Sequence, residues 1–357
     1  MPGDPFHYKA GILLCEAVAL PCLAERFGTP AYIYSKGGIL SRARAYEHAL
    51  AGVPHRVCYA VKANSSLAIL ALLAREGLGF DIVSGGELYR VLAAGAHPAS
   101  VVFSGVGKTA DEIRFALQQG IGSFNCESET EIEWISRIAS ELAMTAAISI
   151  RVNPDVSAIT HPYISTGLRE HKFGVDIRQA EEIYIRACKL PGIRIEGVSC
   201  HIGSQLLDPD PLLEAAGKVL TLVTRLRGVG LPIRFLDLGG GLGVSYRPGE
   251  RAVSIGEFVS RLQSQIQPLE DLTLLLEPGR SIVAESGILL TRVLLVKNNG
   301  AKPFVIVDAG MNDLIRPSLY QAHHEIVPVQ QSSSGERFQA DVVGPVCETG
   351  DFFARGR

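Results

Sequence analysis

Residues 56–65 read RVCYAVKANS, and this stretch determines how the rest of the chain is interpreted. An apolar run of strand type ends in a single cation, and small polar residues separate it from a helix-like segment that starts at Leu67. A lysine that leaves a strand usually extends into water and has no further role. Lys62 is a candidate reactive amine only if other segments bring a phosphate site and a partner for a cofactor ring to the same face.

From Arg56 onward, apolar runs of strand type alternate with helical patterns. The predicted strands are Val57–Val61, Gly79–Val83, Val101–Ser104, Ser123–Cys126, Ala146–Val152, Ile195–His201, Ile233–Leu238 and Leu272–Glu277. The predicted helices are Leu67–Glu76, Gly86–Ala94, Ala110–Gln119, Ser128–Leu142, Ala180–Lys189, Asp210–Gly228 and Ile255–Gln267. Eight buried strands that alternate with helices over about 230 residues predict a (β/α)8 barrel in an α/β fold. A doubly wound sheet with a long insertion is the alternative, and it requires no particular number of strands.

If the fold is a barrel, functional residues should follow the predicted strands, because active sites in this fold lie at the C-terminal ends of the strands. Polar or glycine residues follow each predicted strand: Lys62, Asp81 and Ser84, Ser104, Glu127, Arg151 and Asn153, His201 and Ser204, Gly239–Gly241, and Glu277 with Arg280. Each alone could be an ordinary loop residue. Eight strand ends that all deliver such residues indicate an active site at this end of the barrel.

The pattern changes near both ends of the chain. Residues 1–34 hold a strand-like piece at Gly11–Cys15, a helical pattern at Glu16–Phe27 and a strand-like run at Ala31–Tyr34. Residues 286–357 form an all-β region, with strands expected at Ile288–Lys297, Pro303–Asp308, Glu325–Gln330 and Phe338–Val343. We therefore expect an N-terminal segment at 1–34, a barrel domain at 35–285 and a C-terminal β-region at 286–357.

Composition excludes several classes of partner. The net charge of -3 gives no basic field for nucleic acid or an anionic membrane, and 47% hydrophobic residues allow a large core. No apolar run is long enough to span a bilayer, and the N-terminus lacks a secretion signal, so a cytoplasmic location is expected. The seven cysteines are scattered and never spaced as CxxC, and the adjacent His323 and His324 would point to opposite sides of an extended strand, so no metal site is predicted.

A glycine run follows the seventh predicted strand, in the segment LDLGGGLG at 236–243. Glycines allow backbone N–H groups to approach an anion closely, and barrels often hold phosphate in the loops after strands seven and eight. The same run can also be only a tight turn, but its place in the barrel favours phosphate binding.

Two further segments carry chemistry at strand ends. EPGR at 277–280 places a carboxylate and a guanidinium together, either as a structural ion pair or with Glu277 on a ring nitrogen and Arg280 on an anion. CHIGSQ at 200–205 brings His201, which is either a structural group or a ring that stacks on a cofactor, and Ser204, which can donate to phosphate. The chain thus combines a strand-end lysine, a phosphate loop and a carboxylate that can pair with a ring nitrogen. This combination predicts pyridoxal phosphate bound to Lys62 as a Schiff base. It also predicts an amino-acid substrate.

Eight motifs spread over almost the whole chain resemble those of one family. They are YAVKAN at 59–64, FDIVSGGEL at 80–88, HKFGV at 171–175, CHIGSQ at 200–205, LDLGGGLG at 236–243, EPGR at 277–280, RPSLYQAHHEI at 316–326 and GPVCETGD at 344–351. Together they resemble the diaminopimelate decarboxylases, which are fold type III pyridoxal-phosphate enzymes. The resemblance implies decarboxylation of meso-diaminopimelate to L-lysine and CO2, the last step of lysine biosynthesis.

The resemblance also implies a role for individual residues. Lys62 would carry the cofactor, His201 would stack on its ring, Ser204 with Gly240 and Gly241 would hold its phosphate, and Glu277, Pro278, Gly279 and Arg280 would complete its site. Arg280, Arg316, Tyr320 and Glu348 would contact the substrate. Cys347 would reprotonate the carbanion from the partner subunit, because the family works as a homodimer with active sites at the interface. The family's second domain is an all-β domain built from both chain ends.

The chain departs from this pattern at its C-terminus. Family members continue for several β-strands beyond the segment that matches residues 351–355, and that continuation carries a tyrosine that touches cofactor and substrate. We therefore expect an incomplete β-domain with exposed strand edges and apolar surface. Two alternatives stay open: a decarboxylase for a related amine-bearing acid such as carboxynorspermidine, and an inactive decarboxylase-like binding protein.

Overall fold

The computed structural model describes residues 4–156, 172–266, 271–300, 302–332 and 338–357. His171 of the HKFGV motif lies outside the described residues. The chain divides into two compact units. The first, which we call the barrel unit, comprises Arg42–Val244 and Ala252–Ile282, and the second, the β-unit, comprises Met1–Ser41, Ser245–Arg251 and Val283–Arg357.

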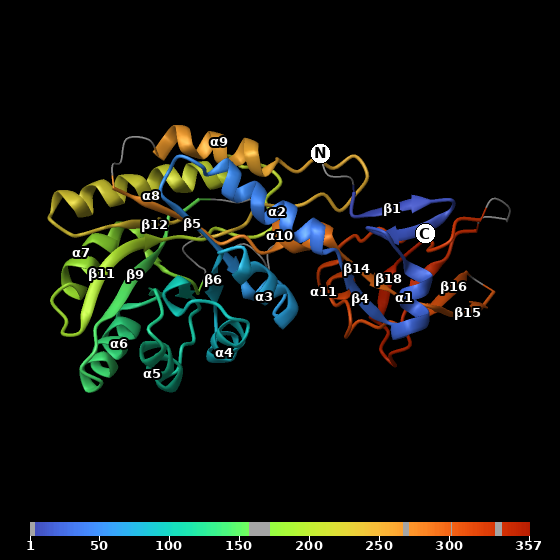
Figure 1. The fold of residues 1–357 in the computed structure, drawn as a ribbon, viewed down its shortest axis with the longest axis horizontal. Coiled ribbons are helices and arrows are strands. Elements are labelled where there is room, and N and C mark those ends of the chain that lie inside the picture. The colour runs from blue at the N-terminus through green and yellow to red at the C-terminus, as the bar shows by residue number, and fades with distance from the viewer. Residues whose placement is uncertain (1–3, 157–171, 267–270, 301, 333–337) are drawn as a thin grey trace. The chain divides into compact units, whose positions relative to one another are not determined.

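The barrel unit contains a closed parallel barrel (Figure 1). Its strands are β5 (His55–Ala60), β6 (Gly79–Ile82), β7 (Val101–Phe103), β8 (Ser123–Cys126), β9 (Ala146–Asn153), β11 (Ile193–Ser199), β12 (Phe235–Asp237) and β13 (Thr273–Leu276). Each pairs in parallel with the next along the chain, β13 pairs with β5, and β8 with β9, so the ring closes. The predicted (β/α)8 barrel is confirmed, and each of the eight predicted strands is present. The short β10 (Val175–Asp176) extends the sheet beside β9.

Helices connect the barrel strands and lie outside them (Figure 1). They are α3 (Leu67–Arg75), α4 (Gly85–Ala93), α5 (Ala110–Gln119), α6 (Glu129–Glu141), α7 (Ile177–Ala187), α8 (Asp210–Gly228) and α9 (Ile255–Ile266), which confirms the predicted helices to within a few residues. Local sequence explains their starts, because a Thr109 hydroxyl and a Glu112 carboxylate cap each other's backbone N–H at the start of α5. In α6, the apolar positions Ile132, Ile135 and Ile138 are buried, as helical periodicity requires.

The inside of the barrel has an apolar layer and, next to the strand ends, a polar layer. Cys58, Val102, Phe235 and Leu275 form a buried cluster contributed by four strands. Side chains alternate along a strand, so the residues two positions further on share the same inward face. These residues are Ala60, Ser104, Asp237 and Glu277, and the three polar ones are buried. The C-terminal end of the barrel therefore begins one layer above its hydrophobic core.

Strand β11 contains an irregularity that a tyrosine compensates. The register with β9 shifts between Ile195 and Gly197, and a Cβ atom on Gly197 would lie 2.2 Å from a ring carbon of Phe235. The Tyr184 hydroxyl of α7 donates to the Gly197 carbonyl at 2.8 Å and accepts from the Ile150 N–H at 3.1 Å. One buried side chain thus satisfies backbone groups of two neighbouring strands.

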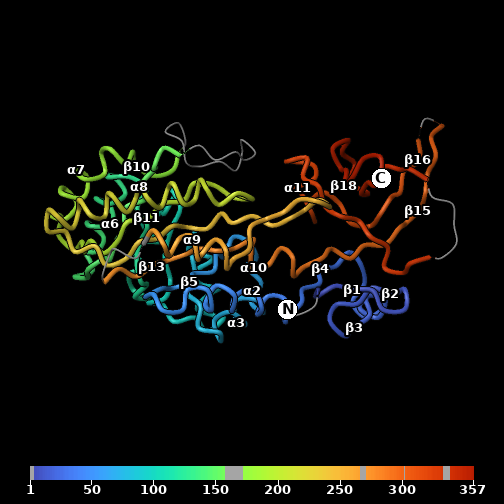
Figure 2. Tube along the Cα trace, turned by 90° about the horizontal axis from the view of Figure 1, so that it is seen from above, coloured from blue at the N-terminus to red at the C-terminus, as the bar shows by residue number. Residues whose placement is uncertain are grey.

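The β-unit is built from both chain ends, as expected. Its strands are β1 (Phe6–Lys9), β2 (Ile12–Cys15), β3 (Val18–Ala19), β4 (Ala31–Tyr34), β14 (Gly287–Leu290), β15 (Val293–Asn298), β16 (Pro303–Val307), β17 (Asp341–Val343) and β18 (Phe352–Ala354). N-terminal β4 pairs antiparallel with C-terminal β14. Figure 2 labels β1–β3, β15, β16 and β18 in this unit. It also holds short helices, α1 (Leu20–Phe27) and α11 (Arg316–Tyr320).

Two predictions in this region are wrong. Ile288–Lys297 is not one strand but β14 and β15, which belong to different sheets. The break occurs because Asp308 accepts hydrogen bonds from the Thr291 hydroxyl and the Arg292 N–H and turns the chain there. Glu325–Gln330 is not assigned as a strand, apart from an isolated bridge at Gln330. Pro328 within it lacks the N–H that a regular ladder would use.

An exposed apolar edge is present in the β-unit. In the described part of the chain β15 pairs only with β16, and it stands at the edge of its four-stranded sheet. The four residues Val293–Val296 are each at least 50% exposed. This edge therefore presents a row of apolar side chains on the surface of the described β-unit.

Replacing Tyr184 with Phe should lower the free energy of unfolding by about 1–3 kcal/mol, because the change leaves the Ile150 N–H and the Gly197 carbonyl buried without their partner. Chemical denaturation of the two proteins measures this difference. The matched control is Tyr89→Phe, because Tyr89 is 69% exposed, and it should change stability by less than about 0.5 kcal/mol. Equal effects of the two substitutions would contradict the role given to Tyr184.

Candidate active site

The predicted reactive amine lies directly after the first barrel strand. Lys62 is part of a short 3-10 turn, Val61–Ala63, and its Nζ contacts Asp81 Oδ2 at 2.7 Å. The pairing follows from register, because Ala60 on β5 lies opposite Asp81 on β6. The Lys62 side chain is half exposed whereas that of Asp81 is fully buried. The amine can therefore be reached by a ligand while its partner stays within the barrel.

Asp81 has unused hydrogen-bonding capacity beside this amine. Among the described residues, no group donates a hydrogen bond to Asp81 Oδ1, although the atom is buried. Desolvation acts to lower the pKa of Lys62, but the charges of Asp81 and Glu277 outweigh it and raise that pKa above its ordinary value. In the free protein Lys62 is thus an ammonium that Asp81 holds, and it must lose a proton before it can act as a nucleophile.

Two carboxyls and an amide occupy the polar layer of the barrel. Asn125 on β8 donates to Asp237 Oδ2 at 3.0 Å and to Glu277 Oε1 at 3.3 Å. Burial raises the pKa of both carboxyls, and the charge of Asp237 raises that of Glu277 further, to well above its ordinary value. Burial and the neighbouring carboxyl thus favour the protonated form of Glu277 more than water favours that of a surface glutamate.

The glycine run is packed too tightly for side chains. A Cβ atom on Gly240 would lie 2.2 Å from the Glu277 carbonyl oxygen. Gly241 has a φ of +116° and a Cβ there would lie 2.6 Å from the Gly203 carbonyl. The Glu277 N–H donates to the Gly239 carbonyl at 2.7 Å, which joins the glycine run to the loop after β13. Three consecutive strand-end loops are thus joined through backbone contacts that require glycine.

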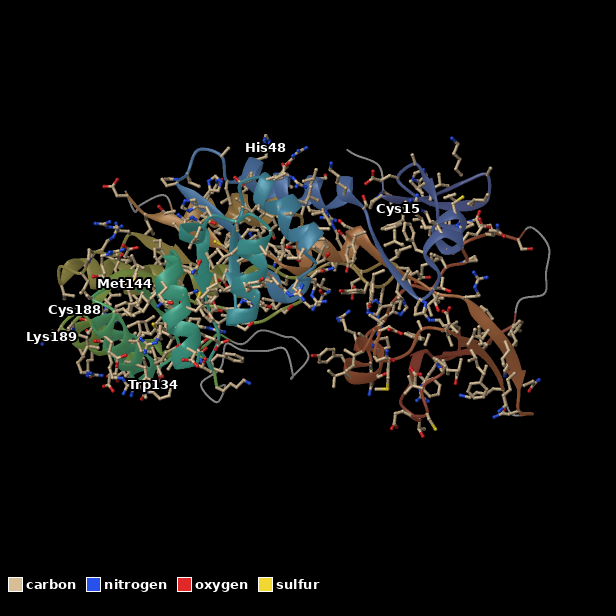
Figure 3. All side chains as sticks on the ribbon, turned by 60° about the horizontal axis from the view of Figure 1, so that its bottom comes forward. Cys15, His48, Trp134, Met144, Cys188 and Lys189 are labelled. Atoms are coloured by element: carbon tan, nitrogen blue, oxygen red, sulfur yellow. The ribbon has the colours of Figure 1, made fainter. Side chains whose placement is uncertain are left out.

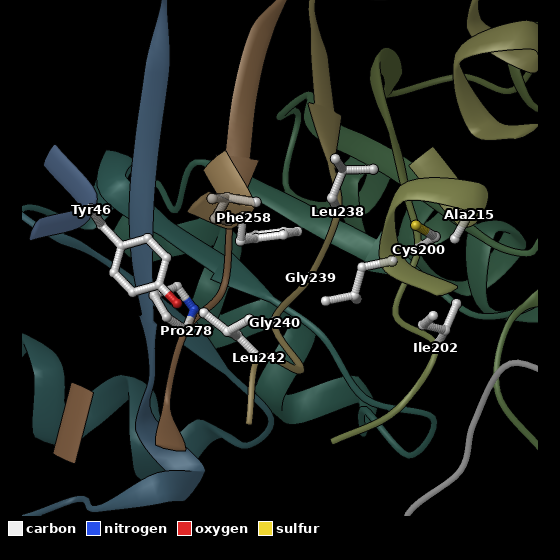
Figure 4. A pocket seen from close by; sticks show the side chains of 12 residues that line it. Tyr46, Cys200, Ile202, Ala215, Leu238, Gly239, Gly240, Leu242, Phe258 and Pro278 are labelled. Atoms are coloured by element: carbon white, nitrogen blue, oxygen red, sulfur yellow. The ribbon is translucent and has the colours of Figure 1, made fainter. Parts of the chain in front are cut away.

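A small apolar cavity of about 20 Å³ lies behind the glycine run (Figure 4). Leu238, Gly239 and Gly240 line it on one side, with Cys200 on one flank and Tyr46 on the other. Its size allows roughly one water molecule but no ligand. The cavity is therefore a packing feature of the loop and not the binding site.

His201 and the Arg280–Ser204 pair lie in the same set of loops. His201 Nδ1 accepts from the Gly240 N–H at 3.3 Å, which leaves its proton on Nε2. Burial, with the charges of Arg151 and Lys62, lowers the pKa of His201 well below its ordinary value, so the ring is neutral. Arg280 donates to Ser204 Oγ at 3.4 Å. These groups give the loops a flat neutral ring, a hydroxyl and a cation.

Five polar residues of the candidate site were not assigned a role from the sequence. They are Asp81, Asn125, Asp237, Glu127 and Arg151. Glu127 and Arg151 form a largely buried pair with 2.9 Å between Arg151 Nη1 and Glu127 Oε1. Arg151 also donates to the His201 carbonyl at 3.2 Å, and Glu127 accepts from the Gly174 N–H at 2.7 Å. The sequence did contain a signal for these residues, because each is a charged or amide side chain within or just after a buried strand. Such groups need hydrogen-bonding or charged partners when they are buried.

The predicted substrate-contacting residues Arg316 and Tyr320 lie in the β-unit. Helix α11 carries both, and the Arg316 guanidinium lies over the Tyr246 ring, 4.6 Å from its centroid. Arg316 Nη1 also contacts His324 Nε2 at 3.0 Å. The Ser318 hydroxyl donates to the Gly350 carbonyl at 2.7 Å, which attaches α11 to the loop 344–351. Arg316 is therefore held by a ring face and an imidazole.

The same loop carries Cys347 and Glu348, both of which are exposed. Asp351 is buried and accepts from the Met311 N–H at 2.7 Å and from the Val346 N–H at 2.8 Å. A single carboxylate thus ties the loop to the segment after β16. Arg316, Tyr320, Cys347 and Glu348 are accordingly gathered in one part of the β-unit, whereas the other predicted site residues gather in the barrel unit.

Comparisons with known proteins agree with this geometry. A family model described as "Pyridoxal-dependent decarboxylase, pyridoxal binding domain" matches residues 36–284. A diaminopimelate decarboxylase from Pseudomonas aeruginosa is 55% identical over 354 residues, which cover 99% of this chain and 85% of that protein. A crystal structure of diaminopimelate decarboxylase from Helicobacter pylori complexed with L-lysine is similar at 47% identity and a TM-score of 0.89, covering 95% of this chain and 84% of that chain. The M. jannaschii enzyme in co-complex with L-lysine gives 37% identity and a TM-score of 0.94, with coverage of 99% and 84%.

The neutral state of His201 should make stability depend on pH. Its folded pKa lies well below the ordinary value of 6.5, so below that pH the unfolded chain binds a proton that the folded chain does not. Between about pH 7.5 and about pH 5.5, the wild-type protein should lose about 1 kcal/mol more unfolding free energy than His201→Gln. Urea unfolding at the two pH values measures this.

His48→Gln serves as the control, because His48 is exposed near the end of helix α2 (Lys36–Ala49) (Figure 3). This variant should keep the wild-type pH dependence. If His201→Gln also kept it, the neutral, buried state of His201 would be refuted.

Proposed function

The chain belongs to the diaminopimelate decarboxylase family of pyridoxal-dependent decarboxylases, and from this membership we propose that it converts meso-diaminopimelate into L-lysine and CO2 at the open end of its barrel. The observation that carries the proposal is the meeting of Lys62, Glu277 and the glycine run on three strand ends of one closed barrel. The relatives named above are 37–55% identical over nearly the whole chain. The expected fold, family and cofactor are thereby confirmed.

The residues present fit pyridoxal phosphate. The glycine run leaves no room for side chains where a phosphate would meet backbone N–H groups, and a buried carboxyl that can hold a proton suits a basic ring nitrogen. When bound, the cofactor supplies an electron sink for the electron pair that remains as CO2 leaves. Lys62 Nζ would attach it, Gly240, Gly241, Ser204 and Arg280 would hold its phosphate, and Glu277 would face its ring nitrogen.

Asp81 prepares the amine. Asp81 Oδ2 lies 2.7 Å from Lys62 Nζ and is placed to accept a proton from the ammonium, which leaves the amine with a free electron pair. Oδ1 of the same carboxyl keeps an unused acceptor for an amine that replaces Lys62. The neutral His201 ring presents a flat face, and its Nδ1 accepts a hydrogen bond from the Gly240 N–H of the glycine run. Pro278 and Gly279 shape the loop that carries Glu277 and Arg280.

We propose that Arg316, Tyr320 and Glu348 recognise the substrate's remote amino-acid group. Arg316, held by Tyr246 and His324, suits a carboxylate, and Glu348 suits the amine that distinguishes diaminopimelate from simpler acids. Tyr320 adds a hydroxyl on the same short helix. Cys347, whose side chain is exposed, would donate the proton that completes the product. We propose that it acts on the active site of a partner subunit in a homodimer.

We further propose a cytoplasmic location, since the substrate and product belong to amino-acid biosynthesis. None of the described helices is long and apolar enough to cross a membrane.

A panel of acids that includes diaminopimelate and carboxynorspermidine separates the main proposal from its alternatives. A related decarboxylase would prefer carboxynorspermidine, and a binding protein would turn over neither.

Lys62→Ala should reduce lysine formation from meso-diaminopimelate at least about a hundredfold, because the variant lacks the amine that attaches the cofactor and moves protons. It should also lose the visible absorbance of the lysine-bound cofactor. The control is Lys189→Ala, because Lys189 is an exposed residue beside Cys188, just after α7 (Figure 3). Wild-type protein that binds the cofactor through Lys62 yet forms no lysine would overturn the proposed reaction.

Glu348→Gln should raise KM for meso-diaminopimelate more than it lowers kcat, because the carboxylate is proposed to bind an amine remote from the reacting carbon. A loss of about 1–3 kcal/mol in transition-state stabilisation is expected for a charged hydrogen bond. Steady-state kinetics measure both constants. The control is Glu182→Gln, because Glu182 lies at an exposed position of α7. An unchanged KM would remove Glu348 from substrate recognition.

A further inference from the structure

Asp237 has no role in the function proposed so far, yet it is fully buried beside Glu277. It ends β12, two residues beyond the core residue Phe235, so its side chain faces the barrel interior. A buried carboxyl is costly unless several donors compensate it. The contacts of Asp237 therefore indicate whether it is charged and which neighbouring group its charge affects.

The hydrogen bonds of Asn125 have a defined direction. The Ser149 hydroxyl donates to Asn125 Oδ1, which places the amide oxygen toward β9 and the Nδ2 donors toward the carboxyls. Of these carboxyl contacts, the one to Asp237 Oδ2 is shorter, at 3.0 Å against 3.3 Å to Glu277. Ser149 in turn contacts Ser199 at 3.2 Å, so the chain of hydrogen bonds crosses three strands.

The donors identify which carboxyl carries the negative charge. Asp237 Oδ1 accepts from the Gly239 N–H at 2.9 Å, while its Oδ2 accepts from Asn125. Glu277 receives only the longer contact from Asn125 and a hydrogen bond links it to Asp237. Two N–H donors stabilise an anion, and a protonated carboxyl is the donor that a neighbouring anion requires. Asp237 is therefore the carboxylate, and Glu277 is the carboxylic acid that donates to it.

We propose that Asp237 is a positioning residue that orients Glu277. Asn125 and Gly239 hold Asp237 in place, and the negative charge of Asp237 keeps one proton shared between Glu277 and the ring nitrogen. The inference rests on the proposed function, in which Glu277 faces the ring nitrogen. The proton that Glu277 shares with Asp237 in the free protein is then available to the ring. The negative charge that remains stabilises a pyridinium, which withdraws electrons better than a neutral ring.

Other charges near the pair act more weakly. Asp81 also raises the pKa of Glu277, whereas the Lys62 ammonium lowers it. Asp81 is engaged with Lys62 at 2.7 Å, so its charge is largely compensated. His201 is neutral, and Arg151 is paired with Glu127. Asp237 is thus the carboxylate in direct hydrogen-bond contact with Glu277, which distinguishes it from a general negative field.

The test uses holoenzyme reconstituted with pyridoxal phosphate that carries nitrogen-15 in its ring. The chemical shift of this nitrogen reports directly whether it is protonated, and a pH titration gives the midpoint. Asp237→Asn keeps the side-chain shape but removes the charge, and it should lower the midpoint by about one pH unit or more, a tenfold loss of proton affinity. Asp81→Asn is the matched control for the loss of one nearby carboxylate, and its shift should be less than half as large.

Glu277→Gln separates this inference from the proposed function. If Glu277→Gln lowers the midpoint while Asp237→Asn leaves it unchanged, Glu277 faces the ring and the role of Asp237 is refuted. Equal shifts in Asp237→Asn and Asp81→Asn would also refute it, because a general field would then suffice. An unchanged midpoint in Glu277→Gln would overturn the proposed place of Glu277 and this inference with it. Should Asp237→Asn fail to fold, Asn125→Ala, which removes the anchor, should shift the midpoint in the same direction by a smaller amount.

Discussion

Closure of the barrel between β8 and β9 is the constraint on which the site depends. The pairing places Asn125 opposite Ser149, and the return of the sheet to β13 and β5 brings Glu277 and Lys62 to the same end. Parallel strands point their C-terminal ends in one direction, so residues as far apart in sequence as Lys62 and Glu277 come to the same end of the barrel. An open sheet with the same strands would leave β8 and β13 at a distance. The hydrogen bond from Asn125 to Glu277 exists because the ring is closed.

The barrel buries Asp237 and Glu277, and the surroundings of the ionisable groups at this end control their protonation. Lys62 is held as an ammonium by Asp81, His201 is held neutral, and Glu277 is held as an acid. The shifts of the Lys62 and His201 pKa values reinforce the states that these groups have in neutral water, whereas the shift of the Glu277 pKa opposes its ordinary ionised state. The buried layer of serines and Asn125 fixes the position of Glu277.

Much of the fold could be predicted because its signals are local. Helix α5 begins where Thr109 and Glu112 form a capping box and ends at Gly120, and both signals are visible in the sequence. The predictions failed in the β-unit, where Asp308 turns the chain between β14 and β15. That turn depends on a side chain about sixteen residues downstream, so no window of neighbouring residues contains it. The place of Tyr184 across the β11 irregularity was hidden for the same reason.

The residues of the candidate site also differ in whether local sequence signals could identify them. Lys62, the glycine run and Glu277 were identifiable because the chemistry of a cofactor demands an amine, close backbone approach and a carboxylate at strand ends, and short motifs carry all three. Asp237 and Asn125 were not, because a polar residue in a buried strand is ambiguous until its partners are known. The sequence by itself determined the strand and helix order of the barrel and the candidate reactive groups. Only the tertiary structure decided which carboxyl keeps a proton, because that depends on burial and on donors from strands far apart in the chain.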